Sequence, residues 1–367
     1  MKYHVKSWLA IVLFLVMTVL PCLIWPLVQP GLAGENTENR NLSEAPALTW
    51  EGLSEWPSAF EAYLDDHLPF RSFLIRWNSA VRYYGFHSSV NENVALGKDG
   101  WLFYTAESVP AFNNGEKRYS EDELALIAAN MQGLKDALEA RGIPFVLMIA
   151  PNKERMYAEY LPDEWGPPAQ DCALFQVTAA LEERTDVKVV CPYETLMNAQ
   201  AEYPDRLVYH KTDTHWNDWG AYLGVQDLLR RLYVSLDEEN VVVTVQKDTP
   251  GDLADMLNLS AFIDPGETCV VSGYETPGTE CTEYDFFGAI RFVSPSMDTG
   301  KLLMSRDSFC SAMAPVLGQA FSESCLVHVQ GFTPDLIDTE QPDIFVLELV
   351  ERSLDLLLDA SHWMPVE

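Results

Sequence analysis

A serine, a histidine and an aspartate in this chain have types and spacing that suit nucleophilic catalysis. Asp213 and His215 are two residues apart, and Ser308 follows a strand expected at 301–304. A serine attacks a carbonyl carbon only when a nearby base takes its proton, and that base needs an acceptor that fixes its tautomer. Side chains at i and i+2 of extended backbone face the same side. The pattern therefore predicts that His215 activates Ser308 and that Asp213 orients His215.

Two other interpretations of the same residues stay open on local pattern alone. Asp307 or Ser308 could simply cap the helix expected at 309–321, because Asp and Ser are common at helix starts. The Asp-x-His pair together with His210 could instead bind iron or zinc. These three residues share one short turn, and no distant His/Cys/Asp cluster completes a ligand set. We expect neither a metal nor another cofactor.

The elements that must position these residues follow an alternating pattern. Ser120 and Glu123 form a capping box for a helix to about residue 140, and 144–150 is continuously apolar, which is typical of a parallel strand covered on both faces. Further strands are expected at 187–191, 207–210, 241–246, 301–304, 325–329 and 344–350, and further helices at 171–184, from 194, at 218–236, 309–321 and 353–359. This alternation predicts an α/β fold with a central, mostly parallel sheet. Ligands bind at the carboxyl ends of such strands, where Ser308 and His215 lie.

The N-terminal part of the chain reads as a membrane anchor. No charged residue occurs in the run 8–28, and 21 residues at about 1.5 Å each cross about 30 Å of hydrocarbon. Lys2 and Lys6 precede this run, so residues 1–7 are expected in the cytoplasm. The alternative is a cleaved signal peptide, because 31–33 (GLA) offers a small-x-small site. Both readings place the remaining chain outside the cytoplasm.

Beyond the anchor, the sequence predicts a tether and one catalytic domain. Residues 29–53 are polar and form the tether, and 54–367 form the extracytoplasmic domain. Its first helices are expected within 54–86, interrupted at Pro69. A hairpin is expected at 94–104, and 247–298, richer in Gly, Pro, Thr and Asp, reads as an insertion with short strands.

Charge narrows the function classes. Acidic residues outnumber basic ones by 55 to 24, a formal net charge of −31. A chain this acidic repels phosphate backbones, so we expect no nucleic-acid binding.

Six cysteines follow the apolar run, and their pairing is open. Neighbouring pairs (172–191, 269–281 and 310–325) would close short loops, whereas the alternative is that several are small buried hydrophobes.

Aromatic residues flank the candidate site segments. They are Trp101, Phe103, Tyr104, Trp216 and Trp219. Aromatic faces bind sugar rings well, and core packing is the alternative for each residue.

Several segments together resemble a known family. Residues 213–216 (DTHW) resemble the signature of the DHHW proteins and of the alginate O-acetyltransferase (AlgX/AlgJ-like) family, whose catalytic domains are SGNH-hydrolase-like. The other similar segments, in order, are 38–40, 60–71, 97–103, 151–153, 251–253, 306–309 and 351–352. The resemblance implies a three-layer SGNH-like sandwich with a circularly permuted motif order, because the Asp-x-His segment precedes the serine.

The resemblance also implies a function. Ser308, His215 and Asp213 match the family's triad, and oxyanion or substrate-binding side chains are expected among Asn152, Arg306, Trp216, Trp101 and Tyr104. Family members O-acetylate exopolysaccharides or cell-wall glycans outside the membrane, often beside a membrane-bound O-acyltransferase that supplies the acetyl group. We therefore expect an O-acetyltransferase with an acetyl-serine intermediate.

Two alternatives keep the same fold. A carbohydrate acetylesterase would use the same triad and pass the acetyl group to water. A noncatalytic polysaccharide-binding or assembly protein would retain the fold without the chemistry.

Overall fold

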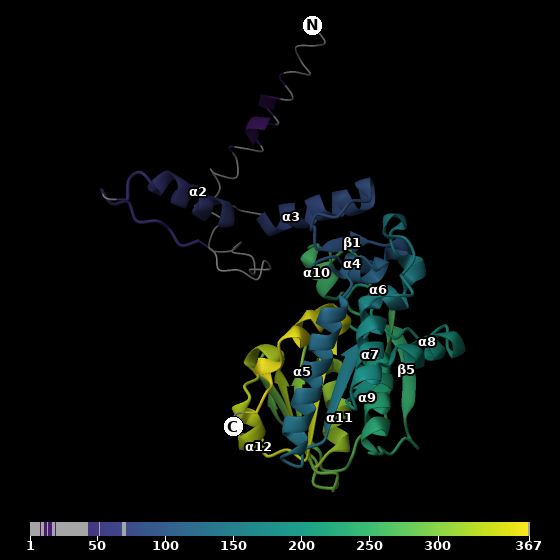
Figure 1. Cartoon of the computed structure of the whole chain (residues 1–367). Coiled ribbons are helices and arrows are strands. Elements are labelled where there is room, and N and C mark those ends of the chain that lie inside the picture. The colour runs from purple at the N-terminus through teal and green to yellow at the C-terminus, as the bar shows by residue number, and fades with distance from the viewer. Residues whose placement is uncertain are drawn as a thin grey trace. The chain divides into compact units, whose positions relative to one another are not determined.

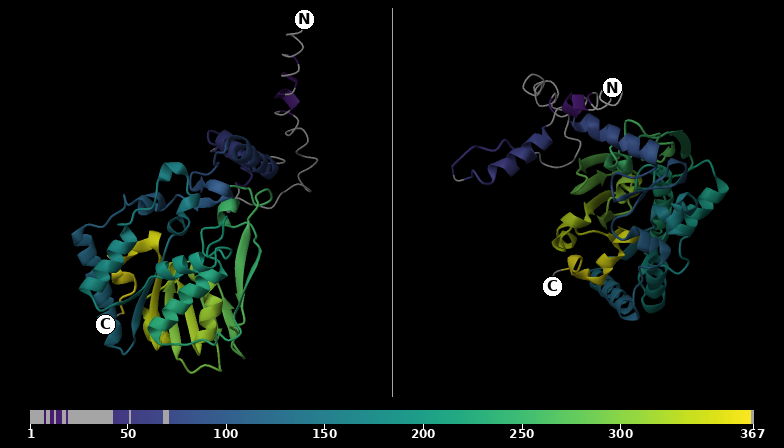
Figure 2. Two further views of the ribbon diagram at one scale, coloured as in Figure 1. Left: turned by 90° about the vertical axis from the view of Figure 1, so that its right-hand side faces the viewer. Right: turned by 90° about the horizontal axis from the view of Figure 1, so that it is seen from above.

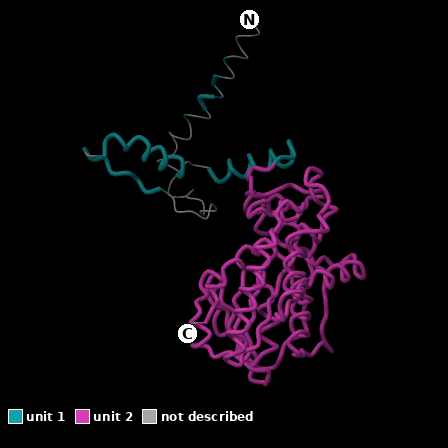
Figure 3. The backbone as a smooth tube through the Cα atoms, viewed as in Figure 1, with its two compact units in different colours: residues 1–88 teal, residues 89–367 magenta. Residues whose placement is uncertain are grey.

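The computed structural model describes residues 8, 11–12, 14–16, 19, 43–50, 52–67 and 71–365. The chain divides into two compact units, residues 1–88 and 89–367 (Figure 3). This boundary lies after residue 54, where we expect the catalytic domain to begin. Residues Asp213, His215 and Ser308 all belong to the second unit.

The first unit contains two of the expected amphipathic helices. These are α2 (Trp56–Asp66) and α3 (Arg71–Ala80), and a π-helical turn, η1 (Val81–Gly85), follows. The expected interruption at Pro69 lies outside the described residues, as do most of the anchor at 8–28 and much of the tether at 29–53. Among the residues that are described, none of the helices is both long and apolar enough to span a bilayer.

A seven-stranded sheet forms the centre of the second unit (Figure 1). The first five strands in spatial order are parallel, and the last two are antiparallel to their neighbours. In that order the strands are β4 (Lys188–Val190), β3 (Phe145–Ala150), β11 (Ile344–Val350), β9 (Lys301–Arg306), β10 (Glu323–His328), β8 (Ala289–Val293) and β7 (Glu280–Tyr284). The predicted α/β sheet is confirmed, but it is mixed, because residues from the segment 247–298 add β8 and β7 at one edge.

Helices cover both faces of this sheet (Figure 2). Val146 and Met148 of β3 pack in the same core as α9 (Asp218–Leu232) and α11 (Cys310–Ala320). Leu147 and Ile149 pack on the other face with α5 (Glu121–Glu139) and α7 (Ala173–Arg184). Successive strand residues point to opposite faces, so a strand covered on both sides must be apolar throughout.

Three predicted elements differ from the structure. The expected strand 207–210 is a single bridge between Tyr209 and Trp216, and the Val208 N–H donates instead to the Tyr157 hydroxyl at 2.9 Å. The strand near 241–246, β5 (Val242–Lys247), leaves the main sheet and pairs with β6 (Glu267–Ser272). Its alternately exposed side chains suit a two-stranded sheet with one open face.

The third difference is the helix expected at 353–359, which is a 3₁₀ helix, η6 (Glu351–Leu358). A further 3₁₀ turn, η7 (Ala360–His362), follows it.

Turn and cap signals are confirmed. The hairpin consists of β1 (Val94–Leu96) and β2 (Leu102–Tyr104), joined through η2 (Lys98–Gly100). Ser120 and Glu123 make the reciprocal capping box at the start of α5. The remaining α-helices are α4 (Val109–Asn114), α6 (Lys153–Met156), α8 (Tyr193–Glu202), α10 (Asp252–Met256) and α12 (Asp335–Glu340).

The six cysteines after the apolar run are all free thiols. Cys172, Cys269, Cys310 and Cys325 are buried, as expected of small hydrophobes, and Cys281 is exposed. None of the three neighbouring pairs forms a disulfide in the described part of the chain.

Candidate active site

The turn between β9 and α11 presents the Ser308 hydroxyl. Asp307 holds this turn: its Oδ1 accepts the Phe309 N–H at 2.8 Å, and its Oδ2 accepts the Val350 N–H of β11 at 2.7 Å. Phe309 is the N-cap residue of α11 and no described side chain caps this helix, so neither Asp307 nor Ser308 takes the capping role that we considered. The Ser308 side chain contacts His215 instead.

His215 lies between Ser308 and Asp213. Its Nε2 is 2.8 Å from Ser308 Oγ, and its Nδ1 is 2.7 Å from Asp213 Oδ1. Asp213 Oδ1 also accepts the backbone N–H of His215 at 2.9 Å, which fixes the carboxylate against the imidazole. Both distances lie in the range over which a base can take the proton of a nucleophile. Two loops 93 positions apart thus form a Ser–His–Asp relay.

The environment keeps Asp213 ionised. Burial raises the pKa of this carboxyl, but the hydrogen bond and charge of His215, with the N–H groups of Asp252 and His215, outweigh burial and hold the pKa well below its usual range. A charged carboxylate at this point favours the tautomer that carries its proton on Nδ1. Nε2 is then free to accept the serine proton.

Asp252 supports the same loop, although its side chain was not among the predicted site residues. Its two carboxylate oxygens accept the Thr214 N–H at 2.8 Å and the Thr214 hydroxyl at 2.6 Å. Its own N–H donates to Asp213 Oδ2 at 2.9 Å. Burial, followed by the nearby charge of Asp213, raises the pKa of Asp252. The signal that could have found it is its place in the family-like segment 251–253.

Gly251 allows this second loop to approach. A Cβ at residue 251 would lie 2.3 Å from Asp213 Cβ and 2.6 Å from Asp213 Oδ2. Such contacts are too close for any side chain, so the absence of a Cβ here lets the Asp252 N–H reach the Asp213 carboxylate.

A Gly251→Ala variant is expected to lose activity without unfolding. The new methyl group must displace the Asp213 carboxylate, and a shift of about 1 Å in a catalytic group costs about 10²-fold in rate. The measurement is the rate at which the protein cleaves an activated ester such as p-nitrophenyl acetate, with circular dichroism as a check on folding. Gly133→Ala in α5 is the matched control, since nothing lies within 4 Å of a Cβ there. A folded Gly251→Ala protein with wild-type rate would contradict this role for Gly251.

Lys153 joins three backbone segments beside the relay. The Nζ donates to the carbonyls of Leu102 at 2.7 Å, Lys211 at 3.0 Å and Asp213 at 2.7 Å. Burial lowers the pKa of Lys153 to about 8. The Lys153 side chain therefore links the β1–β2 hairpin to the Asp213 loop. Its ammonium group donates to three carbonyls of the protein.

Two residues that we expected at an oxyanion or substrate site serve other contacts. The Arg306 guanidinium is fully buried, donates to the Phe286 carbonyl at 2.7 Å and lies over the Phe286 ring. The Asn152 N–H donates to Glu351 at 3.0 Å, and its side-chain oxygen is buried with no partner among the described residues. Neither residue lines a cavity that borders Ser308.

The expected aromatic residues are largely core. Trp101 is buried and stacks on Tyr157 at 4.2 Å between ring centroids. Trp216 is buried and its indole N–H donates to the Phe309 carbonyl at 2.8 Å, although one side of it lines a cavity beside Ser308. Tyr104 is half-buried, with Arg352 over its ring. Trp101 and Trp216 are therefore mainly core residues, which was the alternative to sugar binding.

The residues that could bind a metal ion differ from the set that we considered, because Asp252 takes the place of His210. Ligand atoms of Asp213, His215 and Asp252 lie within 4.8 Å of one another. Each of the four carboxylate oxygens already accepts an N–H or O–H donor. His210 is directed elsewhere, with its Nδ1 2.6 Å from Asp248. This arrangement suits the orientation of an imidazole better than the binding of a cation.

Two cavities lined by residues that the structure describes border Ser308. The larger, about 540 Å³, is lined by residues of the Ser308 turn, the end of β10 and the segment 350–363. The smaller, about 190 Å³, lies on the His215 side and is lined partly by Phe286 and Phe309. A nucleophile between two cavities can be approached by two different groups.

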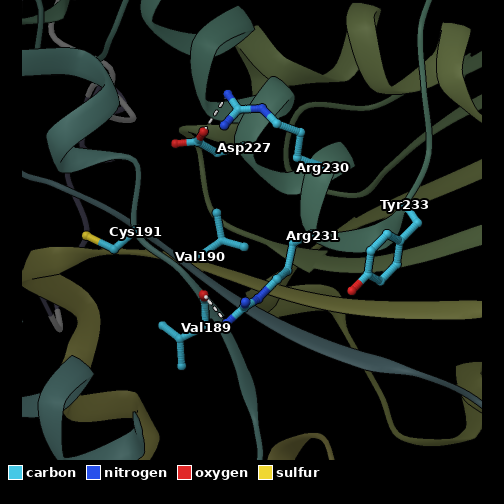
Figure 4. A pocket seen from close by; sticks show the side chains of 7 residues that line it. All are labelled: Val189, Val190, Cys191, Asp227, Arg230, Arg231 and Tyr233. Carbon is cyan, nitrogen blue, oxygen red and sulfur yellow. Dashed lines mark hydrogen bonds and ion pairs between the residues drawn. The ribbon is translucent and has the colours of Figure 1, made fainter. Parts of the chain in front are cut away.

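A further cavity of about 370 Å³ lies at strand β4 and the end of α9 (Figure 4). Its arginines are engaged: Arg230 pairs with Asp227 at 2.8 Å, and Arg231 donates to the Val189 carbonyl at 3.4 Å. None of the predicted site residues lines it.

Comparisons with known proteins identify related sequences and folds. The family described as "SGNH hydrolase-like domain, acetyltransferase AlgX" matches residues 94–281, which include Asp213 and His215 and end before Ser308. The probable alginate O-acetylase AlgJ of Pseudomonas aeruginosa is 31% identical over 240 residues, 64% of this chain and 58% of that protein. The corresponding protein of Pseudomonas syringae pv. tomato is 35% identical over 174 residues, 47% of this chain and 42% of that protein. The chain thus spans about half the length of these two relatives.

Solved structures share the fold. PatB1 of Bacillus cereus superposes with a TM-score of 0.53 at 16% identity, over 72% of this chain and 97% of that one. A DHHW family protein of Eubacterium siraeum superposes with a TM-score of 0.52 at 15% identity, over 73% of this chain and 94% of that one. With the family match over half of its residues, the chain belongs to the AlgX family of SGNH hydrolase-like acetyltransferase domains.

Proposed function

We propose that this protein is a carbohydrate O-acetyltransferase that works through an acetyl-serine intermediate. The observation that carries the proposal is the continuous relay from Asp213 Oδ1 through His215 to Ser308 Oγ, with distances of 2.7 Å and 2.8 Å. The names of the relatives, probable alginate O-acetylases, support acetyl transfer to a polysaccharide.

In the first half-reaction Ser308 is acetylated. His215 Nε2 takes the hydroxyl proton as Oγ forms a bond to the acetyl carbonyl carbon of the donor. We assign the resulting oxyanion to the Ser308 N–H, because this group lies just before α11 and makes no hydrogen bond within the described residues. When the tetrahedral intermediate collapses, the donor's leaving group departs with the proton from His215.

In the second half-reaction a sugar hydroxyl takes the acetyl group. Its oxygen attacks the acetyl carbon while His215 Nε2 takes its proton, and the bond to Ser308 Oγ breaks. The proton returns from His215 to Oγ, so the enzyme is regenerated. Water in the place of the sugar would give acetate, which is the esterase alternative.

The test separates these outcomes with one donor. The full chain is mixed with p-nitrophenyl acetate, and intact-mass spectrometry follows the protein while sugar oligomers and acetate are analysed as products. We expect a protein adduct of one acetyl group and an acetylated oligomer in excess of free acetate. Acetate alone would establish an esterase, and no adduct in the wild-type protein would contradict the catalytic proposal.

We also propose that the domain acts outside the cytoplasm, anchored by residues 8–28, with its acetyl group supplied by a membrane-bound O-acyltransferase. The support is the uncharged apolar run preceded by Lys2 and Lys6. A C-terminal alkaline phosphatase fusion, which is active only outside the cytoplasm, should be active in cells. An inactive but stably expressed fusion would place the domain inside.

A further inference from the structure

The larger cavity beside Ser308 is the natural place for the acceptor sugar. Its volume of about 540 Å³ falls in the range of small-molecule sites, whereas the 190 Å³ cavity on the His215 side is closer in size to a small acyl group. Ser308 lines both, so a sugar hydroxyl at the edge of the larger cavity meets the acetylated Oγ and the nearby His215 Nε2.

The charges around this cavity are mostly negative. Four carboxylates line it, and Arg352 is the one Lys or Arg side chain among the lining residues described. The carboxylates are Glu107, Asp307, Asp355 and Asp359. Arg352 is already paired, because its Nε lies 3.0 Å from Glu107 Oε2. The described part of the lining therefore offers a uronate carboxylate no unpaired guanidinium or ammonium group.

Two of these carboxylates, Asp355 and Asp359, differ in whether a lysine or arginine neutralises their charge. Asp355 has a partner outside the lining, Lys117, at 2.7 Å. Asp359 is exposed and has no Lys or Arg ion-pair partner among the described residues, and its Oδ1 accepts the Ser361 N–H at 2.9 Å. This charge is left facing the cavity.

The two histidines of the lining differ in their surroundings. Burial and the charge of Arg306 lower the pKa of His328, so this imidazole is neutral near pH 7. His362 has Nε2 2.6 Å from the Val329 carbonyl, so this nitrogen donates within the protein.

We infer that the acceptor is a glycan of neutral or amino sugars, and that a polyuronate is a poor acceptor for this chain. The inference rests on the proposed transferase function and specifies its substrate. A polyuronate would bring a carboxylate on each residue toward Asp359 and the other acids, and it would meet no unpaired Lys or Arg among the lining residues that the structure describes. A hydroxyl-rich or ammonium-bearing chain can hydrogen bond with the same oxygens.

Acceptor competition tests the inference. The full chain, p-nitrophenyl acetate and oligomers of equal length are used: β-1,4-glucose, β-1,4-glucosamine and β-1,4-mannuronate. We expect kcat/KM for the mannuronate oligomer to be at least about tenfold below both others at low salt, with a smaller gap at 0.5 M NaCl because salt screens the repulsion. Equal or better use of mannuronate would overturn the inference.

A matched pair of variants assigns the effect to the cavity. Asp359→Asn removes one negative charge and keeps an oxygen for the Ser361 N–H, whereas Glu183→Gln removes one from the exposed surface of α7. We expect Asp359→Asn to raise kcat/KM for mannuronate by about 3- to 10-fold, as one charge at close range does, and Glu183→Gln to leave it unchanged. Equal effects of both variants would show that only net charge matters and would overturn the role of the cavity.

The acetyl-enzyme separates failure of this inference from failure of the proposed function. Its formation from p-nitrophenyl acetate needs no sugar. If the adduct forms and mannuronate is the best acceptor, only the acceptor class is wrong. If no adduct forms, the transferase function itself is wrong, and the inference falls with it.

Discussion

Ser308→Ala is expected to abolish acetyl-enzyme formation and to lower acetyl transfer by at least about 10⁴-fold, the scale seen when a triad nucleophile is removed. The reason is that the Ser308 Oγ, 2.8 Å from His215 Nε2, forms the bond to the acetyl carbon. The measurement is intact-mass detection of the adduct after rapid mixing with p-nitrophenyl acetate, together with the steady-state transfer rate.

The control is the same substitution elsewhere on the sheet. Ser324 of β10 is buried and its hydroxyl donates to the Leu317 carbonyl at 3.4 Å, remote from the relay. Ser324→Ala should keep the adduct and most of the rate. An adduct that persists in Ser308→Ala would show that another nucleophile reacts, and the proposed mechanism would be wrong.

Asp213→Asn is expected to lower kcat by about 10⁴-fold while the fold remains, since an amide cannot hold the imidazole in the reactive tautomer. The Asn NH₂ group can donate to Nδ1, which places the ring proton on Nε2 and removes the acceptor for the Ser308 proton. Transfer kinetics and circular dichroism check the two parts of this expectation.

The chain contains its own control for this prediction. His210 and Asp248 form a second His–Asp pair, with 2.6 Å between Nδ1 and Oδ2, but His210 does not contact Ser308. Asp248→Asn should therefore keep the transfer rate within about threefold, because it is not part of the relay. Equal losses in Asp213→Asn and Asp248→Asn would point to general loosening of the loop.

Asp213 also predicts a pH effect on stability. Its folded pKa lies below its usual value of 3.8, so it stabilises the folded state above that value, and this contribution is lost as the pH falls further. The wild-type protein should therefore exceed Asp213→Asn in free energy of unfolding near pH 7, and the difference should shrink below about pH 4. Urea unfolding at several pH values measures it, and a constant difference would contradict the pKa argument.

Much of the fold could be predicted because its signals are local. A strand covered on both faces must be apolar at every position, and Phe145–Ala150 and Ile344–Val350 show this directly. The capping box at Ser120 and the turn at Lys98–Gly100 likewise depend on residues a few positions apart. The position of strand β5 along the chain was predicted correctly. Its pairing with β6 outside the main sheet was not, because the choice of partner strand depends on tertiary contacts.

The supporting residues of the site were harder to predict. Asp252 matters because its N–H and carboxylate meet Asp213 and Thr214, 38 or 39 positions away. Lys153 and Arg306 have charged side chains of a kind that is usually exposed to solvent. Both are nevertheless buried and donate to backbone carbonyls. Arg306 was expected among the oxyanion or substrate-binding residues, and nothing in the local sequence indicates that it is buried against the Phe286 carbonyl.

The sequence by itself determined which residues are able to do this chemistry. The Asp-x-His pair and a serine between a strand and a helix are specified by residue type and short spacing, as are the apolar strands that carry them. Only the tertiary structure decided that Ser308 and His215 meet, that Gly251 admits the Asp252 N–H, and that the cavity beside Ser308 is acidic. The physical reason is that hydrogen bonds and charge interactions depend on distances of a few ångströms in space. The packing of both sheet faces sets those distances between loops that are far apart in the chain.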